Sequence, residues 1–186
     1  MSRRFWTLLC ALPLFSCSTH APMSTVDYVD IDRFMGDWYG VANIPTFLEK
    51  GAHNAVETYQ QNPDGSISTT FTFRDGGFDG ERKIYKPTGF IEDAETNALW
   101  GMQFVWPIKA DYRIVYLDEA YTKTVIGRAA RDYLWVMART PELSGNEFEE
   151  IKRFIASIGY DATQLQRVPQ QWPERPATIT EEVNAS

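Results

Sequence analysis

Turn-forming residues interrupt this chain roughly every 8–12 residues from Ile31 onward, a spacing typical of all-β sandwiches and barrels. The segments between the turns are eight expected strands, at 38–45, 54–61, 67–74, 81–92, 98–106, 111–118, 123–129 and 133–140. Their connections are short, so consecutive strands should pair antiparallel without long crossovers. A long meander of this kind hides its edges by closing on itself. We therefore predict an all-β fold, an eight-stranded antiparallel up-and-down barrel.

One α-helix is expected after the last of these strands. Ser144 and Glu147 form a capping box, and Gly159 is placed to end the helix in the left-handed conformation. Between them, apolar residues recur at helical spacing: Phe148, Ile151, Phe154, Ile155 and Ile158. We predict that this stripe packs against the outside of the barrel. A last short strand is expected around Leu165 and Val168.

The N-terminus has the features of a bacterial lipoprotein signal. Arg3 and Arg4 precede an almost wholly apolar stretch of signal-peptide length. The segment Leu14-Phe15-Ser16-Cys17 resembles a lipobox, in which the cysteine becomes the acylated first residue, and Ser18 after it favours the outer membrane. We predict lipid attachment at Cys17, and ordinary signal cleavage nearby is the alternative.

These features divide the chain into four parts. Residues 1–16 are the expected signal peptide, and 17–30 are the lipidated N-terminus and a tether without periodicity. Residues 31–170 form the barrel with its helix, and 171–186 are polar and proline-containing, which predicts a flexible tail.

Charge and residue counts exclude several classes of function. The net charge of −7 gives no attraction to phosphate backbones, so nucleic acid is not an expected partner. Only two cysteines and two histidines occur, and His53 alone of these four lies in the body of the chain. A Cys/His nucleophile pair or a zinc site is therefore not expected there. We predict no metal, no cofactor and no catalytic residues.

Three segments follow one another in a recognisable order: Gly36-Asp37-Trp38 opens the first expected strand, Asp111 to Tyr116 lies in the sixth, and Arg131 to Pro141 contains the last, with Arg139 near its end. They resemble the signatures of the lipocalin family, and of its bacterial outer-membrane lipoprotein branch and apolipoprotein D in particular. The first resembles the family's G-x-W signature, the second its T-D-Y-x-x-Y segment, with Ala110 replacing the threonine and one extra residue between the tyrosines, and the third its last barrel strand, which ends in a signature arginine. The resemblance implies that Trp38 plugs the closed end of the barrel and that Arg139 stacks across it.

Strand alternation then predicts which side chains line the barrel. The expected ligand-binding residues are mostly aromatic: Trp100, Met102, Phe104, Tyr112, Ile114, Tyr116, Trp135 and Met137. On the first strand Trp38, Gly40, Ala42 and Ile44 share one face, and its small residues favour an open cavity over a barrel filled by its own side chains. Phe47 and Leu48 follow in a loop that forms either a lid or a satellite cluster.

The resemblance implies a non-enzymatic, lipid-anchored envelope protein on the periplasmic side of the outer membrane. Its expected ligand is hydrophobic or amphipathic, a fatty acid or a lysophospholipid, bound for storage, transport or membrane maintenance. Alternatives that the sequence leaves open are a binder of a bilin, haem or carotenoid pigment, a lipocalin-fold isomerase, and an interaction module with a filled barrel. A homodimer is also left open.

Overall fold

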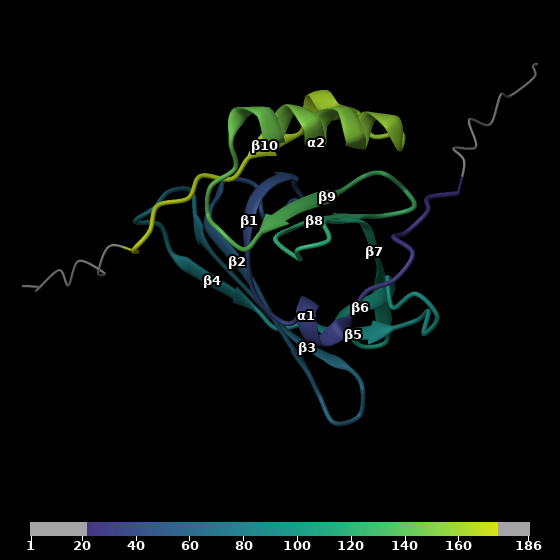
Figure 1. Cartoon of the computed structure of the whole chain (residues 1–186). Helices are drawn as coiled ribbons and strands as arrows, with labels where there is room; N and C mark the ends of the chain where they lie inside the picture. Colours follow the sequence, from purple (N-terminus) through teal and green to yellow (C-terminus); the bar gives the residue numbers. More distant parts are fainter. Residues whose placement is uncertain (1–21, 175–186) are drawn as a thin grey trace, which may run out of the picture.

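The computed structural model describes residues 22–174, in which a closed antiparallel barrel carries one long helix on its outside (Figure 1). The strands are β1 (Gly36–Ile44), β2 (Ala52–Gln61), β3 (Ile67–Asp75), β4 (Arg82–Tyr85), β5 (Thr88–Ile91), β6 (Leu99–Val105), β7 (Ile108–Leu117), β8 (Lys123–Gly127), β9 (Leu134–Ala138) and β10 (Gln166–Arg167). Both β4 and β5 pair with β3, the other consecutive strands from β1 to β9 pair in turn, and β1 pairs with β9 to close the barrel. The predicted eight-stranded barrel is confirmed, because β4 and β5 are two halves of its fourth strand.

The fourth strand differs from the single segment predicted over 81–92. It breaks at Lys86 and Pro87, because proline has no N–H to donate to a ladder. In the described part of the chain, β4 pairs only with β3, whereas β5 pairs with both β3 and β6. The free edge of β4 therefore lies in the barrel wall.

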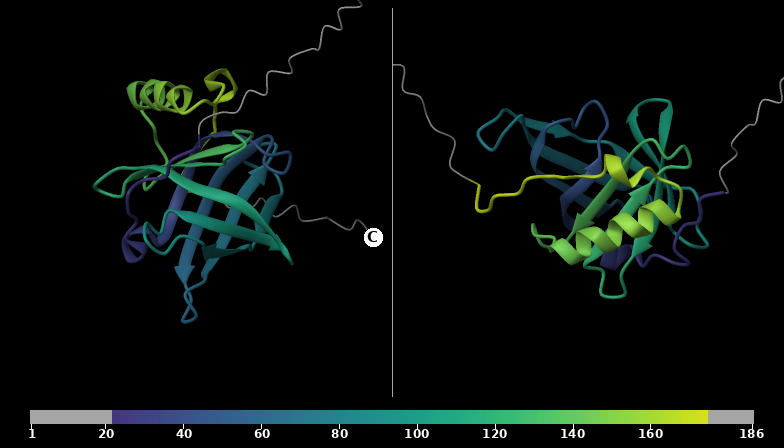
Figure 2. Two further views of the ribbon diagram at one scale, coloured as in Figure 1. Left: turned by 90° about the vertical axis from the view of Figure 1, so that its right-hand side faces the viewer. Right: turned by 90° about the horizontal axis from the view of Figure 1, so that it is seen from above.

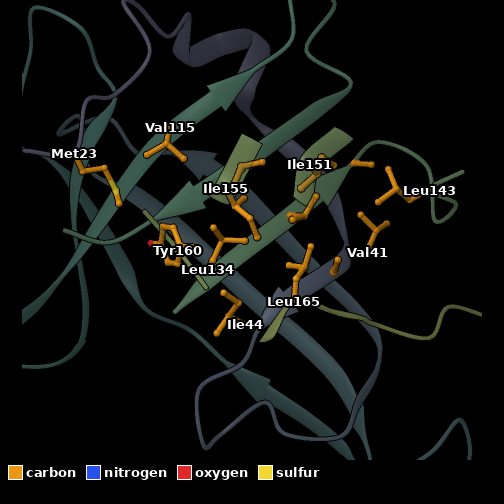
Figure 3. Close-up of a cluster of buried hydrophobic side chains, with 14 residues drawn as sticks. Met23, Val41, Ile44, Val115, Leu134, Leu143, Ile151, Ile155, Tyr160 and Leu165 are labelled. Atoms are coloured by element: carbon orange, nitrogen blue, oxygen red, sulfur yellow. The ribbon is translucent and has the colours of Figure 1, made fainter. Parts of the chain in front are cut away.

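The helix α2 (Gly145–Ser157) lies across the outside of the barrel, as predicted (Figures 1 and 2). Ser144 caps it with both halves of the capping box present, and Gly159 follows it at φ +93°. Ile151 and Ile155 point from the helix into an apolar cluster on the outer faces of the strands (Figure 3). This outer cluster contains Met23, Val41, Ala42, Ile44, Val115, Val125, Leu134, Val136, Ala138, Leu143, Ile151, Ile155, Tyr160 and Leu165.

Two β-bulges reverse the inward–outward alternation that the sequence predicts. One shifts the register of β1 against β9 between Gly40 and Ala42, so that Ile44 belongs to the outer cluster and not to the lining (Figure 3). The other shifts β7 against β8 between Ile114 and Tyr116. Tyr116 consequently packs outside the barrel, with its ring 5.5 Å from that of Phe154 on α2.

The described N-terminal residues are packed rather than free. Val26 donates its N–H to the carbonyl of Ile114 at 2.9 Å, and Val29 donates to Thr96 at 2.8 Å. The Met23 side chain enters the outer cluster, and Val29 is fully buried at one end of the barrel. A short helix, α1 (Ile31–Phe34), follows. The prediction of a tether through residue 30 is therefore wrong for residues 22–30, because backbone hydrogen bonds and buried apolar side chains hold this segment against the barrel.

The C-terminal segment also follows the barrel surface further than predicted. The strand β10 pairs with β1, which confirms the last short strand. Beyond it, Asn54 and Gln171 exchange two hydrogen bonds, and Arg74 forms an ion pair with Glu174 at 2.8 Å. The tail boundary at residue 171 is therefore too early. The predicted signal peptide, Cys17 and the rest of the tail lie outside the described residues.

Candidate functional site

One end of the barrel interior, called the closed end here, is filled with aromatic side chains. Phe34 and Trp38 pack with ring centroids 5.1 Å apart, and Trp38 donates its indole N–H to the carbonyl of Phe34 at 2.8 Å. Trp100 lies 5.5 Å from Phe34 and donates its own indole N–H to Asn97. All three rings are fully buried, so the end is sealed by stacked rings whose polar atoms are satisfied.

Arg139 covers this end from outside. Its guanidinium carbon lies 3.8 Å above the ring of Trp38, a cation–π contact. Its terminal nitrogens donate hydrogen bonds to four backbone carbonyls, those of Arg33, Phe34, Met35 and Asp37. Gly36, at φ +92°, permits the turn that presents these carbonyls. The three signature residues Gly36, Trp38 and Arg139 thus act together to close this end of the barrel.

The opposite, open end contains a cavity of about 170 Å³ with a largely apolar lining. An engineered apolar cavity of about 150 Å³ binds benzene, so this volume admits at least a ring-sized group. Its lining comprises Thr46, Phe47, Leu48, Glu49, Glu57, Thr69, Phe71, Tyr85, Pro87, Met102, Phe104, Ala110, Asp111, Tyr112, Arg128, Tyr133 and Trp135.

Four of the eight residues expected to bind ligand line this cavity: Met102, Phe104, Tyr112 and Trp135. Trp100 and Ile114 are fully buried in the packed closed end instead. Met137 belongs to the same packed cluster and borders a much smaller void of about 10 Å³. Tyr116 lies on the outside under α2, because the bulge in β7 turns it outward.

Glu57 on β2 lines the deep side of the cavity and is not among the residues predicted from the sequence. Its Oε2 accepts a hydrogen bond from the Tyr59 hydroxyl, which lies 2.7 Å from the hydroxyl of Tyr112. Burial, with a smaller contribution from the charge on Glu49, raises the pKa of Glu57 to about 8. The carboxyl group is therefore mostly protonated at neutral pH. Alternation with buried Tyr59 would have placed Glu57 inward.

Glu49 reaches the cavity from the β1–β2 loop and is only 7% exposed. Its carboxylate accepts hydrogen bonds from the Trp135 indole N–H at 2.7 Å, from the Thr46 hydroxyl at 3.0 Å and from the Asn43 amide at 3.4 Å. Burial raises the pKa of Glu49, and these three donors oppose that rise. The loop residue thus anchors Trp135 in the lining, a role that no local sequence pattern indicates.

The mouth of the cavity combines exposed apolar groups with a cation. Phe47 is 84% exposed and Phe104 54% exposed, although both line the cavity. Arg128 pairs with Asp132 at 3.1 Å, but its buried Nε has no hydrogen-bond partner. The Thr69 hydroxyl, deeper in the cavity, also lacks a partner. Unpaired buried donors of this kind are rare in native proteins.

The described residues contain no group of three or more potential metal ligands. Over the same residues 22–174, neither the length nor the apolarity of any helix suffices to cross a membrane.

Comparisons with known proteins agree with this architecture. Residues 29–170 match the family described as Lipocalin-like domain. Temperature-induced lipocalin-1 of Arabidopsis thaliana is 29% identical over 154 residues, covering 80% of this chain and 83% of the relative. Outer membrane lipoprotein Blc of Escherichia coli K12 is 25% identical over 166 residues, covering 86% and 92%.

Apolipoprotein D of Bos taurus is 23% identical over 170 residues, covering 89% of this chain and 82% of the relative. Among solved structures, insecticyanin from Manduca sexta superposes with a TM-score of 0.64 at 13% identity, covering 83% of this chain and 87% of insecticyanin. The family match spans most of the chain, and the expected resemblance to bacterial outer-membrane lipoprotein lipocalins and to apolipoprotein D is confirmed. The chain is a member of the lipocalin family.

Proposed function

We propose that this protein is a lipid-anchored envelope lipocalin that binds an anionic amphiphile, a fatty acid or a lysophospholipid, for storage, transport or membrane maintenance. The observation that carries the proposal is the apolar cavity with the unpartnered Arg128 Nε among its lining. The acyl chain would lie against Met102, Phe104 and Trp135, and the anionic group would remain near Arg128.

The energetics of binding favour an orientation with the acyl chain buried and the anionic group at the mouth. Burying apolar chain contributes roughly 25 cal/mol per Å², and only the surplus over the costs of association appears as affinity. The deep side disfavours negative charge, because burial and the charge on Glu49 already raise the pKa of Glu57 to about 8, so a carboxylate or phosphate would not be stabilised there. A guanidinium at the mouth supplies charge-assisted hydrogen bonds to the same group.

Lipid anchoring and the outer membrane form the second part of the proposal. It is supported by the lipobox at Leu14 to Cys17 and by relatives named outer membrane lipoproteins. Two or more acyl chains anchor a protein stably, since each buried CH₂ contributes roughly 0.8 kcal/mol. Cys17→Ser should abolish acylation. Mass spectrometry of the mature N-terminus decides: a wild-type chain that starts elsewhere, or carries no acyl mass, contradicts the anchor.

Titration of tryptophan fluorescence with hexadecanoate or a lysophospholipid, below the critical micelle concentration, tests the cavity. Trp135 lines it, whereas Trp172 packs against Tyr39 outside, so Trp135→Phe should remove most of the saturable signal and Trp172→Phe should not. Arg128→Gln should weaken binding of the anionic ligand, with Arg153→Gln on the exposed face of α2 as the control. A flat titration together with flat calorimetry would overturn the proposal.

A further inference from the structure

The deep side of the cavity carries a set of polar side chains that acyl-chain binding does not use. Glu57 and Thr69 come from the neighbouring strands β2 and β3, and Tyr112 comes from β7 across the barrel. All three line the cavity. Tyr59 lies directly behind them, 1% exposed, and its hydroxyl joins Glu57 to Tyr112. We call Glu57, Thr69 and Tyr112 the polar floor.

The polar floor has unused hydrogen-bonding capacity. Thr69 is 3% exposed, and its hydroxyl has no partner. Tyr59 occupies Oε2 of Glu57, and no hydrogen bond within residues 22–174 uses Oε1. Leaving such groups unpaired in an apolar cavity costs free energy, so a ligand atom that pairs with them gains more than it would elsewhere.

The surroundings restrict which ligand atom fits. Among cavity-lining residues the charged or acidic groups are Glu49, Glu57, Asp111 and Arg128, and Arg128, the one cation of this set, is the proposed partner of the ligand's anionic group at the mouth. An anion would therefore meet carboxyl groups without a cation. A cation would need an ionised partner, but Glu57 is mostly neutral at pH 7 and Glu49 already accepts three hydrogen bonds. A neutral oxygen satisfies both constraints.

We infer that the polar floor is a recognition site for a neutral hydroxyl or carbonyl group at the buried end of the ligand, so that an acyl chain oxygenated at its far end binds without the loss of affinity that burying its oxygen would otherwise cause. This inference rests on the proposed function, because it assumes that the chain enters with its anionic group left at the mouth. Glu57, Thr69 and Tyr112 bind the ligand oxygen, and Tyr59 is a positioning residue that orients Glu57 and Tyr112.

The test compares saturated fatty acids of increasing chain length with their ω-hydroxy derivatives, by calorimetry below the critical micelle concentration. An unpaired hydroxyl buried in an apolar cavity would weaken binding by about tenfold or more. At the chain length that reaches the floor, we expect wild type to bind the hydroxylated acid within about threefold of the plain acid.

Variants separate the floor from the rest of the cavity. Glu57→Leu and Thr69→Val should each weaken the hydroxylated ligand, by about tenfold for Glu57→Leu, while leaving the plain acid unchanged or tighter. Glu57→Gln retains a donor and an acceptor and should keep the wild-type ratio. Thr70→Val, on the other face of the same strand β3, is the matched control. Thermal melts of each variant establish that it is folded.

The outcomes are distinguishable. If neither ligand binds wild type, the proposed function itself fails. If the plain acid binds but the hydroxyl costs tenfold or more in wild type and in both floor variants alike, the polar floor does not recognise the ligand and the inference is overturned. Tight binding of an alkylamine that is lost in Glu57→Gln would likewise overturn it in favour of a cation site.

Discussion

The two ends of the barrel interior share the same strands but differ in how completely their polar groups are paired. At the closed end, the indole N–H groups of Trp38 and Trp100 both have backbone acceptors, and Arg139 satisfies four carbonyls. At the open end, Thr69 and Arg128 each have an unpaired buried donor. The difference favours a stabilising role for the closed end, and it supports the proposal that the ligand binds at the open end.

The boundary between the two ends is the Tyr59–Tyr112 pair. Tyr112 stacks on Trp100 with centroids 5.4 Å apart, so its ring belongs to the closed end. Its hydroxyl faces the cavity side and bonds to Tyr59. Variants at each end should therefore give opposite patterns, with losses of stability at the closed end and losses of binding at the open end.

The largest expected effect is at Trp38. Trp38→Ala should lower the free energy of unfolding by about 3–5 kcal/mol, as for other buried aromatic truncations, because Phe34 and Arg139 lose their shared packing surface. Chemical denaturation measures the change. A loss below about 1 kcal/mol would place the stability of the barrel elsewhere.

Arg139→Met should cost about 1.5–3 kcal/mol, since charge-assisted hydrogen bonds to backbone carbonyls are lost. A double-mutant cycle with Trp38→Phe should give a coupling energy of at least about 0.5 kcal/mol. Arg139→Lys keeps the charge but not the planar fork and should recover only part of the stability. Additive effects of the two changes would show that the stacked pair does not act as a unit.

Replacing Glu57 should raise the free energy of unfolding, in contrast to the losses expected at Trp38 and Arg139. Its pKa is raised from 4.5 in the unfolded chain to about 8 in the fold, so the native state binds more protons between these values. Wild-type stability should therefore fall as pH rises from about 4.5 through about 8, with most of that penalty present above pH 8.

Glu57→Gln should remove this slope and gain about 1–2 kcal/mol at pH 8, measured by denaturant unfolding at several pH values. The partners that face Glu57 are Tyr59 on its own strand, Tyr112 from β7 and Glu49 from the loop, so Glu49→Gln should reduce the slope in part. Equal slopes in wild type and Glu57→Gln would contradict a buried, protonated carboxyl.

The smallest effect on stability is expected at Phe47. Phe47→Ser changes a side chain that is 84% exposed, so the unfolding free energy should stay within about 0.5 kcal/mol. Ligand binding should weaken nonetheless, because this ring lines the mouth of the cavity. Unchanged affinity would remove the loop from the binding site and leave the deeper residues to carry it.

The sequence predicts the barrel and its helix because those depend on local signals. Turn spacing defines the strands, and the capping box at Ser144 defines the start of α2. The lining is harder to predict, because one bulge exchanges the inward and outward faces for the rest of a strand. Simple alternation predicts Tyr116 inside the barrel, whereas the bulge in β7 turns it outward. Bulges depend on pairing between strands that the sequence of one strand does not specify.

Buried carboxyl groups were missed for a related reason. A charged residue in a strand is normally assigned to the solvent face, yet Glu57 lies opposite Trp38 in the β1–β2 register and shares the inward face. The burial of Glu49 depends on how the β1–β2 loop folds back over the cavity, and a loop has no periodic pattern from which this could be predicted. The break at Pro87, in contrast, lies inside the single strand predicted over 81–92 and is predictable from the sequence, since proline interrupts a central strand.

The free edge of β4 affects how large a ligand the protein can accept. No ladder hydrogen bonds join β4 to β6 within residues 22–174, so the cavity wall on that side consists of side chains, including Tyr85, Pro87 and Phe104. Widening a hydrogen-bonded wall requires breaking the ladder, whereas exposed side chains change rotamer within picoseconds to nanoseconds. Rotation of Phe104, whose side chain is 54% exposed, would therefore reshape this side of the opening without breaking a backbone ladder.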